Sequence, residues 1–499
     1  MIRTILICNV GNSDLAIPVT SLSETLQQQA RDRQLSERGR AAEVLQNFEQ
    51  LLPDIELPLV RKALRHVEEQ QGRGPDRVIL FASNQQEPPD TSPELYNKDT
   101  ITTAEVIRRV LSERYGINSE HVTIWCITDE QSRNNPADYD GVLRSMERQL
   151  RELHQSEPTA RCFLEVTGGT PAMTTSLLIA GTKVLGKQAI PIYITQNSEM
   201  AYSLNTGRTL LQHTVLEVLL SDLEIYSYAS AVKTFENHAD LFDFQSSGIQ
   251  RLILALLNYA NQRLNLDLTS CRRSLNGVDG VEGGRFRTDV SRLYDEVVRE
   301  DPLWLLREVF FGAKIKFDRG EFADFIGRIF RFQEGCLRYL VERGGAQFAD
   351  VQGRNFEQAW VDAQPKLAKK LTYEGVVRYD VNRVRLTKVA EYLADERGSA
   401  DEKAICADLR KIDALANLRN RTQIAHGFTG LSRQVLADHF SLTEQQRKGQ
   451  RHAPPEDADR IVETLLSIYT AISSSPPDIS PFDGINQLIK KLFVNETYA

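Results

Sequence analysis

Residues 418–427, LRNRTQIAHG, place two arginines and an asparagine ahead of a histidine. An imidazole that titrates near neutrality can take up or release a proton, and a guanidinium can hold phosphate oxygens. The residues with this chemistry are Arg419, Asn420, Arg421 and His426. The spacing alone does not identify a site, because an arginine also stands five residues before His66, His213 and His452.

A hydrophobic stripe distinguishes His426 from the other histidines. Along the predicted helix, four apolar positions at helical spacing are followed by three polar ones on the same face: Ile405, Leu409, Ile412 and Ala416, then Arg419, Gln423 and His426. Polar groups on a face that otherwise packs must find partners, line a cleft or meet another subunit. The alternative is a satisfied core histidine beside surface arginines.

A glycine-rich loop is the second candidate site. Residues 161–181, RCFLEVTGGTPAMTTSLLIAG, predict a strand, a tight turn and a helix. Gly168 and Gly169 permit a positive φ or close approach, Thr170 suits an N-cap, and Pro171 suits the first helical turn. We expect free backbone N–H groups here, which favour a phosphate or another polar acceptor. The loop lacks the dinucleotide and P-loop patterns, so a plain strand-to-helix turn is the alternative.

The elements that must position these residues differ between the two halves of the chain. The first half alternates helical patterns with five apolar runs: TILICNV, RVILFAS, HVTIWCIT, RCFLEVT and QAIPIYI. Strands that are apolar on both faces predict an α/β Rossmann-like domain with a mostly parallel sheet. Ligands of such sheets bind at the carboxyl ends of the strands, where this chain has polar loops: 11–14, 83–86, 128–135 and 167–170.

These loops predict a nucleotide sensor. Amide, hydroxyl and carboxyl groups can read hydroxyls and base edges while glycines cradle phosphate. The predicted ligand-binding residues are Gly11, Asn12, Ser13, Asp14, Ser83, Asn84, Gln85, Thr167, Gly168, Gly169, Thr170, Pro171 and Met173.

From about Leu216 onward, helical periodicity predominates. Residues 372–393 are the exception, because alternating residues flank DVN, 380–382, as in a hairpin, and a helix follows. A hairpin insertion and the wing of a winged helix both fit. The role of this segment stays open.

Size and charge restrict the function further. A chain of 499 residues should hold two or three domains, and its formal charge of -8 gives none of the global basicity of non-specific nucleic-acid binders. The six cysteines lie far apart and predict buried free thiols in a reducing compartment. Without a leader pattern or a long apolar run, we expect a cytoplasmic protein with no membrane partner.

ILICNVGNSDL together with LEVTGGTPAMTTSLLIAG resembles the CARF domain, the CRISPR-associated Rossmann-like sensor of cyclic oligoadenylates. The resemblance covers roughly residues 1–215, and TGGTPAM is its most specific part. The family often has lysine where Pro171 stands, so a side-chain charge on the ligand is lost at that position. The resemblance implies a cyclic oligoadenylate as activator, with cA4 favoured and cA6 possible, because an even ring matches a two-fold symmetric pocket.

RNRTQIAHG resembles the R-x4-6-H motif of HEPN ribonucleases, which accompany CARF sensors in type III CRISPR effectors. Arg421 leaves four residues before His426 and Arg419 leaves six; we favour Arg419 and retain Arg421. The resemblance implies cleavage of single-stranded RNA by its own 2′-OH, without metal or other catalytic cofactor, giving a 2′,3′-cyclic phosphate and a 5′-OH. His426 would transfer the proton, an arginine would hold the phosphate, and Asn420 would orient neighbouring groups.

One motif copy gives half of a plausible site, so the resemblance implies a homodimer. The expected domains are a sensor over 1–215, a helical connector over 216–300 and a mainly α-helical HEPN-like ribonuclease over 301–499 with a hairpin insertion. One rival is a ligand-controlled transcription regulator with a winged-helix module, although the negative charge argues against stable DNA binding. A second is a small-molecule enzyme whose active site is the glycine loop and whose helical half serves only dimerisation. Separately, the sensor of the proposed ribonuclease could degrade its activator slowly, with Asn12, Ser13 or Thr170 positioning the 2′-OH.

Overall fold

The computed structural model describes residues 2–31, 36–87, 91–195, 200–242, 244, 246–278, 286–298, 301–422, 427–428, 430–448, 457–477 and 480–497. It divides into two compact units, Met1–Glu217 and Val218–Ala499. Two residues of the predicted nuclease face, Gln423 and His426, lie outside the described residues. Among the helices of the described chain, we find none that is long and apolar enough to cross a membrane.

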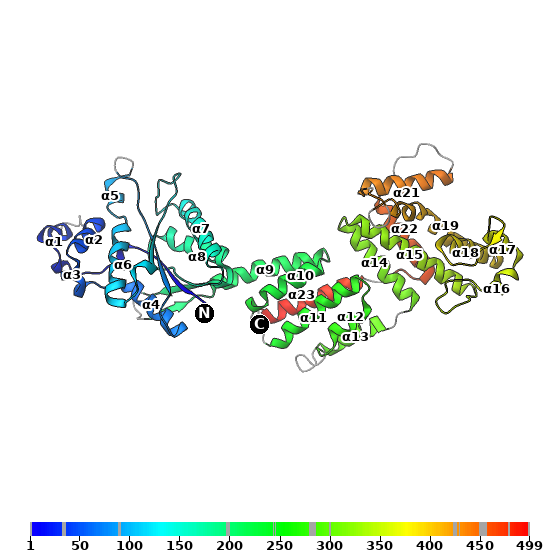
Figure 1. Ribbon diagram of the computed structural model, residues 1–499, viewed down its shortest axis with the longest axis horizontal. Helices are drawn as coiled ribbons and strands as arrows, with labels where there is room; N and C mark the ends of the chain where they lie inside the picture. The colour runs from blue at the N-terminus through cyan, green and yellow to red at the C-terminus, as the bar shows by residue number, and fades with distance from the viewer. Residues whose placement is uncertain are drawn as a thin grey trace. The chain divides into compact units, whose positions relative to one another are not determined.

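A six-stranded sheet with the order β3-β2-β1-β4-β5-β6 forms the centre of the first unit (Figure 1). Its strands are β1 (Thr4–Asn9), β2 (Arg77–Ala82), β3 (Val122–Cys126), β4 (Arg161–Glu165), β5 (Ala189–Ile194) and β6 (Ala201–Ser203). The first five are parallel, and β6 runs antiparallel to β5. The five predicted strands and the Rossmann-like fold class are confirmed. β6 was not predicted, because three residues show no usable period.

Helices cover both faces of this sheet. They are α1 (Glu24–Arg31), α2 (Glu37–Gln46), α3 (Phe48–Leu51), α4 (Pro58–Gln71), α5 (Pro93–Tyr96), α6 (Ile101–Tyr115), α7 (Tyr139–Ser156) and α8 (Pro171–Leu185). Figure 1 shows α4 and α6 on one face and α7 and α8 on the other. Successive residues of β1 alternate between the two cores, since Leu6 belongs to the core under α4 and α6 and Ile7 to the core under α7 and α8.

The strand order reverses at β1. This strand pairs with β2 on one side and with β4 on the other, with Asn9 opposite Phe81 and Cys8 opposite Glu165. Loops after β1 and β4 therefore leave the same edge of the sheet at its switch point, which is where parallel α/β sheets bind ligands.

The second unit is helical, and the boundary between the units falls within α9. The remaining helices are α9 (Thr206–Glu224), α10 (Tyr228–His238), α11 (Ser247–Leu264), α12 (Leu268–Leu275), α13 (Arg287–Val298), α14 (Pro302–Asp318), α15 (Phe322–Arg343), α16 (Gln358–Asp362), α17 (Pro365–Leu371), α18 (Arg383–Arg397), α19 (Ala400–Lys411), α20 (Asp413–Arg419), α21 (Arg433–Lys448), α22 (Asp459–Ser473) and α23 (Pro481–Thr497). The division of this region into a connector, 216–300, and a nuclease domain, 301–499, stays a prediction.

One buried ion pair holds α11 to α14. The Arg263 guanidinium donates to both carboxylate oxygens of Glu308 at 2.8 Å, and neither side chain is exposed. A third hydrogen bond runs from Arg263 to the Tyr259 hydroxyl at 3.0 Å. This network satisfies the buried charges within the helical core.

The predicted hairpin is present, but its turn is not at DVN. Strands β7 (Thr372–Tyr373) and β8 (Val376–Val377) pair across Glu374 and Gly375, which have φ values of 48° and 77°. Two central residues with positive φ form the tight hairpin turn that matches strand twist. Asn382 instead caps α18, because its side chain accepts a hydrogen bond from the Arg385 amide.

Candidate functional site

The glycine loop packs directly on the loop after β1. A Cβ on Gly168 would lie 2.6 Å from the Asn9 carbonyl oxygen, and one on Gly11 would lie 2.7 Å from the Gly169 nitrogen. Gly169 has a φ of 84°, which favours glycine. Thr170 caps α8 by accepting from the Met173 amide, and Pro171 is the first residue of that helix. The predicted turn, cap and helix start are all confirmed.

Two buried carboxyl groups accept hydrogen bonds from amides of these two loops, including amides of the glycine loop that we expected to be free. Glu165, at the end of β4, accepts from the amides of Thr167 at 2.7 Å and Gly168 at 3.1 Å. Asp14 accepts from the Gly11 amide at 2.6 Å. The expectation of free N–H groups in the glycine loop is therefore wrong for Thr167 and Gly168, because the acidic side chain at the end of β4 satisfies their amides first.

Burial raises the pKa of both carboxyl groups. It raises the pKa of Glu165 to about 7, although hydrogen bonds from Thr167 and Gly168 oppose this rise. Burial also raises the pKa of Asp14 well above its usual value, and the nearby Glu165 adds to the rise. Both amide-group atoms of the buried Asn9 side chain lack a hydrogen-bond partner among the described residues. The two loops thus rest on a buried polar cluster of Asn9, Asp14 and Glu165.

Exposure separates the predicted ligand-binding residues into three groups. Asn12, Ser13, Asn84 and Pro171 are exposed, while Thr167, Gly169 and Thr170 are half-buried. The rest are buried: Gly11, Asp14, Ser83, Gln85, Gly168 and Met173. Ser83 and Thr100 exchange hydrogen bonds, and the Gln85 amide donates to the Asp99 carboxylate. We therefore interpret Ser83 and Gln85 as residues that support the loop.

The Thr170 hydroxyl is also occupied, since it donates to the Pro136 carbonyl and accepts from the Met173 amide. This leaves Asn12, Ser13 and Asn84 as the polar side chains of the predicted set that are most accessible at this sheet edge.

Two arginines that sequence analysis missed connect these loops. Arg40 of α2 donates to the Asn12 carbonyl at 3.2 Å, and Arg38 donates to the Asn84 side chain at 3.0 Å. The Asn134 side chain, from the loop after β3, donates to the Asn84 carbonyl at 3.4 Å. The sequence carries no signal for these contacts, because they join residues that are far apart along the chain and meet only through packing.

In the second unit, the predicted helix through His426 is interrupted. α19 and α20 are separated at Ile412, and α20 ends at Arg419, after which 420–422 form a turn and a bend. The apolar part of the stripe is confirmed where its side chains are described, since Ile405, Leu409 and Ile412 are buried. A single continuous helix from 405 through 422 is wrong, because the chain turns at the end of α20.

Arg419 and Arg421 lie in different environments. The Arg419 guanidinium stacks over the Phe330 ring of α15, with 4.3 Å from its central carbon to the ring centroid, and is half-buried. Arg421 and Asn420 are exposed. The Gly427 amide donates to the Thr422 carbonyl at 3.1 Å, so the chain on either side of 423–426 is joined at the end of α20.

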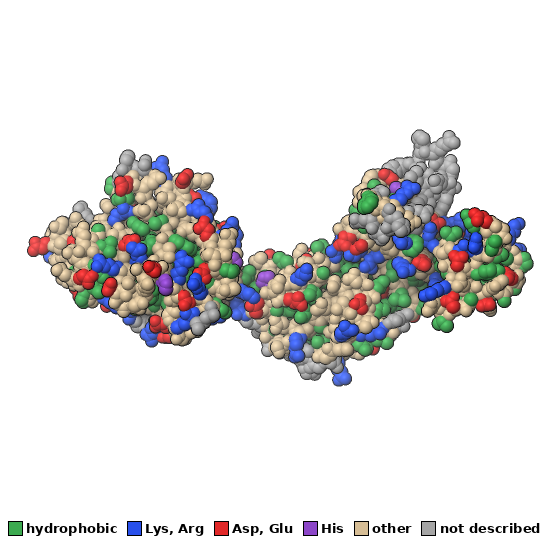
Figure 2. All heavy atoms as spheres, viewed as in Figure 1, with side chains coloured by type: hydrophobic (Ala, Val, Ile, Leu, Met, Phe, Trp, Pro, Cys, Tyr) green, Lys and Arg blue, Asp and Glu red, His purple; other side chains and the backbone are tan. Residues whose placement is uncertain are grey.

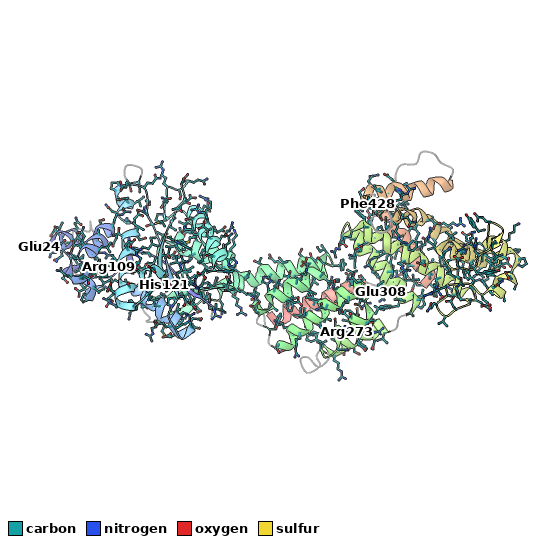
Figure 3. All side chains as sticks on the ribbon, viewed as in Figure 1. Glu24, Arg109, His121, Arg273, Glu308 and Phe428 are labelled. Carbon is teal, nitrogen blue, oxygen red and sulfur yellow. The ribbon has the colours of Figure 1, made fainter. Side chains whose placement is uncertain are left out.

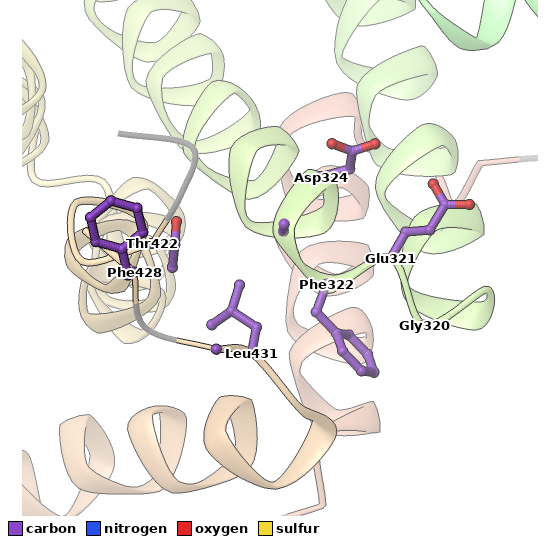
Figure 4. Close-up of a pocket in the computed structure, with 9 residues that line it drawn as sticks. Gly320, Glu321, Phe322, Asp324, Thr422, Phe428 and Leu431 are labelled. Atoms are coloured by element: carbon purple, nitrogen blue, oxygen red, sulfur yellow. The ribbon is translucent and has the colours of Figure 1, made fainter. Parts of the chain in front are cut away.

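Two clefts lie beside this segment. One, of about 460 Å³, is lined by Thr422, Phe428 and Leu431 on one side and by Phe322, Glu321 and Asp324 on the other (Figure 4). The second, of about 500 Å³, is lined by Phe330, Leu371, Tyr373, Asn382, Arg383, Val384, Arg385, Lys388, Arg419 and Asn420. We call the second one the basic cleft.

Charge distinguishes the two clefts. The first contains two carboxylates, of which Glu321 pairs with Lys316 and with Arg319. The basic cleft has four cationic residues and no acidic residue in its lining. On the face shown in Figure 2, Lys and Arg side chains are mixed with Asp and Glu side chains in both units. Against such a mixed surface, the basic cleft is a local concentration of positive charge, which would attract an anion.

Comparison with solved structures identifies a protein with this fold. The structure of Enterococcus italicus Csm6 bound to cyclic hexa-2′-fluoro-hexa-dAMP matches with a TM-score of 0.59 and 16% sequence identity. The match covers 98% of this chain and 100% of that chain. No protein-family model and no curated protein matches the sequence. The likeness therefore shows that both units together share the fold of Csm6.

Proposed function

We propose that the chain is a cyclic-oligoadenylate-activated endoribonuclease that cleaves single-stranded RNA, a CARF sensor joined to a HEPN nuclease. The observation that carries the proposal is the placement of Arg419. It is half-buried over Phe330, forms no ion pair with a described carboxylate, and lines a cleft whose other charges are all positive. A guanidinium held in this way is suited to bind the scissile phosphate.

In this proposal, cleavage uses the 2′-OH of the RNA as nucleophile. It gives a 2′,3′-cyclic phosphate and a 5′-OH. Arg419 stabilises the charge that develops on the phosphate oxygens, and Asn420 orients neighbouring groups. His426 transfers the proton, since an imidazole can act in either direction near neutral pH. Arg421, which is exposed, remains the second candidate arginine.

The sensor site lies at the switch point of the sheet. We assign the ligand contacts to Asn12, Ser13 and Asn84 together with Thr167, Gly169, Thr170 and Pro171, which all have accessible surface. The sequence favoured cA4, with cA6 as the second choice. The Csm6 structure with this fold holds a cyclic molecule of six nucleotides. We therefore place cA6 first among the activators to test.

The active form is proposed to be a homodimer in which two copies of the motif meet. The side chain of Phe428, two residues beyond His426, is fully exposed (100%) (Figure 3). A large apolar side chain in water beside a candidate site supports contact with a second copy. Differential affinity of the ring for the active arrangement would then provide activation.

The deciding experiment measures cleavage of fluorogenic single-stranded RNA in EDTA, with cA3, cA4, cA6 or no ring. Wild type is compared with His426→Ala, and with His238→Ala as a matched control. His238 lies at the end of α10, where its ring contacts the Thr234 carbonyl.

The proposal expects cleavage that depends on an even ring, is lost in His426→Ala and is retained in His238→Ala. If no ring induces cleavage although a ring binds, the nuclease proposal fails, and a ligand-controlled DNA-binding regulator becomes the better explanation. Loss of the ring during the assay in His426→Ala as well as in the wild type would identify degradation of the activator by the sensor.

A further inference from the structure

The basic cleft has a wall whose residues take no part in the proposed nuclease chemistry. This wall is the hairpin β7–β8 with the first two turns of α18, in the segment drawn yellow in Figure 1. It contributes Tyr373, Arg383, Arg385 and Lys388 to the cleft, and Arg419 lies in the same lining.

The four cationic side chains of the basic cleft differ in whether they form ion pairs with carboxylates. Arg383 pairs with Asp413 and also contacts Gln333, and Arg385 pairs with Asp380. Lys388 and Arg419 form no ion pair among the residues that the structure describes. Two positive charges are therefore available to an anion, while the other two are partly neutralised by carboxylates outside the lining.

Tyr373 brings an aromatic ring to the same cleft. It is 61% exposed on β7, and Val376, opposite it on β8, is 53% exposed. A tyrosine this exposed contributes little to a core. An exposed ring beside cations is the combination on which single-stranded nucleic acids stack their bases while their phosphates are neutralised.

The wall is firmly attached to the scaffold that holds Arg419. The hairpin leaves α17 at the buried Leu371, whose carbonyl accepts from the Arg378 amide at 3.2 Å. Gln333 of α15 donates to Asp413 at the start of α20, and Arg383 of α18 contacts both residues. Tyr373 and Arg419 are thus placed by one set of packed helices.

We propose that this wall holds the substrate RNA beside the scissile phosphate, with Tyr373 stacking on a base and Lys388 contacting a backbone phosphate. Both act as substrate-positioning residues, and the inference rests on the proposed nuclease function. Double-stranded DNA fits the wall less well. Each strand of the hairpin has only two residues, and α18 buries Leu386, Val389 and Leu393.

Binding is measured by fluorescence anisotropy with a labelled 2′-O-methyl RNA of about 12 nucleotides, with the activating ring present. This RNA has no free 2′-OH and so is not cut by the proposed chemistry. The variants are Tyr373→Ala, Tyr373→Phe and Lys388→Ala. The controls are Tyr294→Ala, an exposed tyrosine of α13, and Lys366→Ala, an exposed lysine of α17 paired with Glu396.

Tyr373→Ala should raise the Kd about tenfold, as expected for loss of one base–aromatic stack, and Tyr373→Phe should restore binding. Lys388→Ala should lower the slope of log Kd against log salt by about 0.7, the value for one phosphate contact to a single strand. In cleavage of ordinary RNA, Tyr373→Ala should raise KM more than it lowers kcat.

The Kd, the salt slope and KM could all be unchanged in variants that still cleave RNA on activation. That result would contradict the proposed RNA-binding role of the wall without contradicting the nuclease function. Tighter binding of a duplex DNA of equal length, lost in Tyr373→Ala, would reassign the wall to DNA. Absence of ring-dependent cleavage in the wild type would instead remove the proposed function itself.

Discussion

At the scale of single residues, the surroundings of a side chain decide which of two similar groups can act. Arg419 and Arg421 are two positions apart, yet only Arg419 is held against an aromatic ring and lines the basic cleft. A fixed guanidinium loses less freedom when it binds a phosphate than an exposed one. Glu165 shows the same effect, because burial raises its pKa to about 7, so near neutral pH it holds a proton part of the time, whereas a carboxyl group in water would be ionised.

Arg419→Ala should lower kcat of activated RNA cleavage by about 100-fold or more, the usual effect of removing a group that stabilises developing charge. Arg421→Ala should cost less than about tenfold. Single-turnover cleavage at saturating ring measures both. The reverse ranking would assign the catalytic role to Arg421.

Glu165→Gln should stabilise the first unit above neutral pH. In the folded protein, the pKa of Glu165 is raised from 4.5 to about 7. Between these values the unfolded chain releases a proton that the folded chain keeps, so the group makes stability fall as pH rises through this window. The full effect above pH 7 is about 3 kcal/mol. Gln keeps an oxygen to accept from the loop amides.

Urea unfolding at pH 5 and pH 8 tests this prediction. Unfolding is monitored by the fluorescence of Trp125, and every protein carries Trp304→Phe and Trp360→Phe so that Trp125 is its sole tryptophan. Glu152→Gln, an exposed position of α7, is the control. The stability loss between the two pH values should shrink in Glu165→Gln and not in the control. An equal loss in all three proteins would contradict a raised pKa of the buried Glu165.

At the scale of elements, close backbone contacts shape the loops of the first unit, and shared helices position Arg419 in the second. The loops after β1 and β4 touch at glycines where no Cβ fits. In the second unit, α15 carries Phe330 beneath Arg419 and Gln333 against Asp413 at the start of α20. α18 adds Arg383, which pairs with the same Asp413. Helices α15 and α18 thus hold α20, which carries Arg419 at its end.

Gly168→Ala should destabilise the first unit by about 1–3 kcal/mol, the range for an overpacked site, since its Cβ would lie 2.6 Å from a backbone oxygen. Gly74→Ala is the matched control, because its nearest neighbour is a side-chain oxygen 3.7 Å away. The Trp125 unfolding midpoint measures both. Equal midpoints would mean that the loops after β1 and β4 separate easily.

At the scale of the whole molecule, the proposal needs a second copy of the chain. A sensor that binds a symmetric ring and a nuclease that contributes one motif per chain both require a two-fold arrangement. Activation is then a change in the population of dimer arrangements, which the ring can bias only through a difference in affinity between them.

Phe428→Glu should weaken self-association at least about tenfold and lower RNA cleavage at limiting protein concentration, without lowering the melting temperature of the monomer. Its side chain is fully exposed, so the folded monomer loses no packing. Sedimentation equilibrium and cleavage at several protein concentrations measure the effect. Val351→Glu, also fully exposed, is the control. Unchanged association in Phe428→Glu would place the interface elsewhere.

The sequence by itself determined the five parallel strands, the helix start at Thr170 and Pro171, the polar strand ends and the helical second half. Each of these follows from local periodicity or from the conformational preference of a few adjacent residues. The sequence also singled out Arg419, because it continues an apolar stripe whose described members are buried.

Only the tertiary structure decided which groups are available for chemistry. It assigned loop amides to Glu165 and Asp14, ended α20 at Arg419 and moved the hairpin turn to Glu374 and Gly375. It also assembled the basic cleft from α15, the hairpin, α18 and the end of α20. Contacts between residues far apart along the chain arise from packing, which no local pattern of residues encodes.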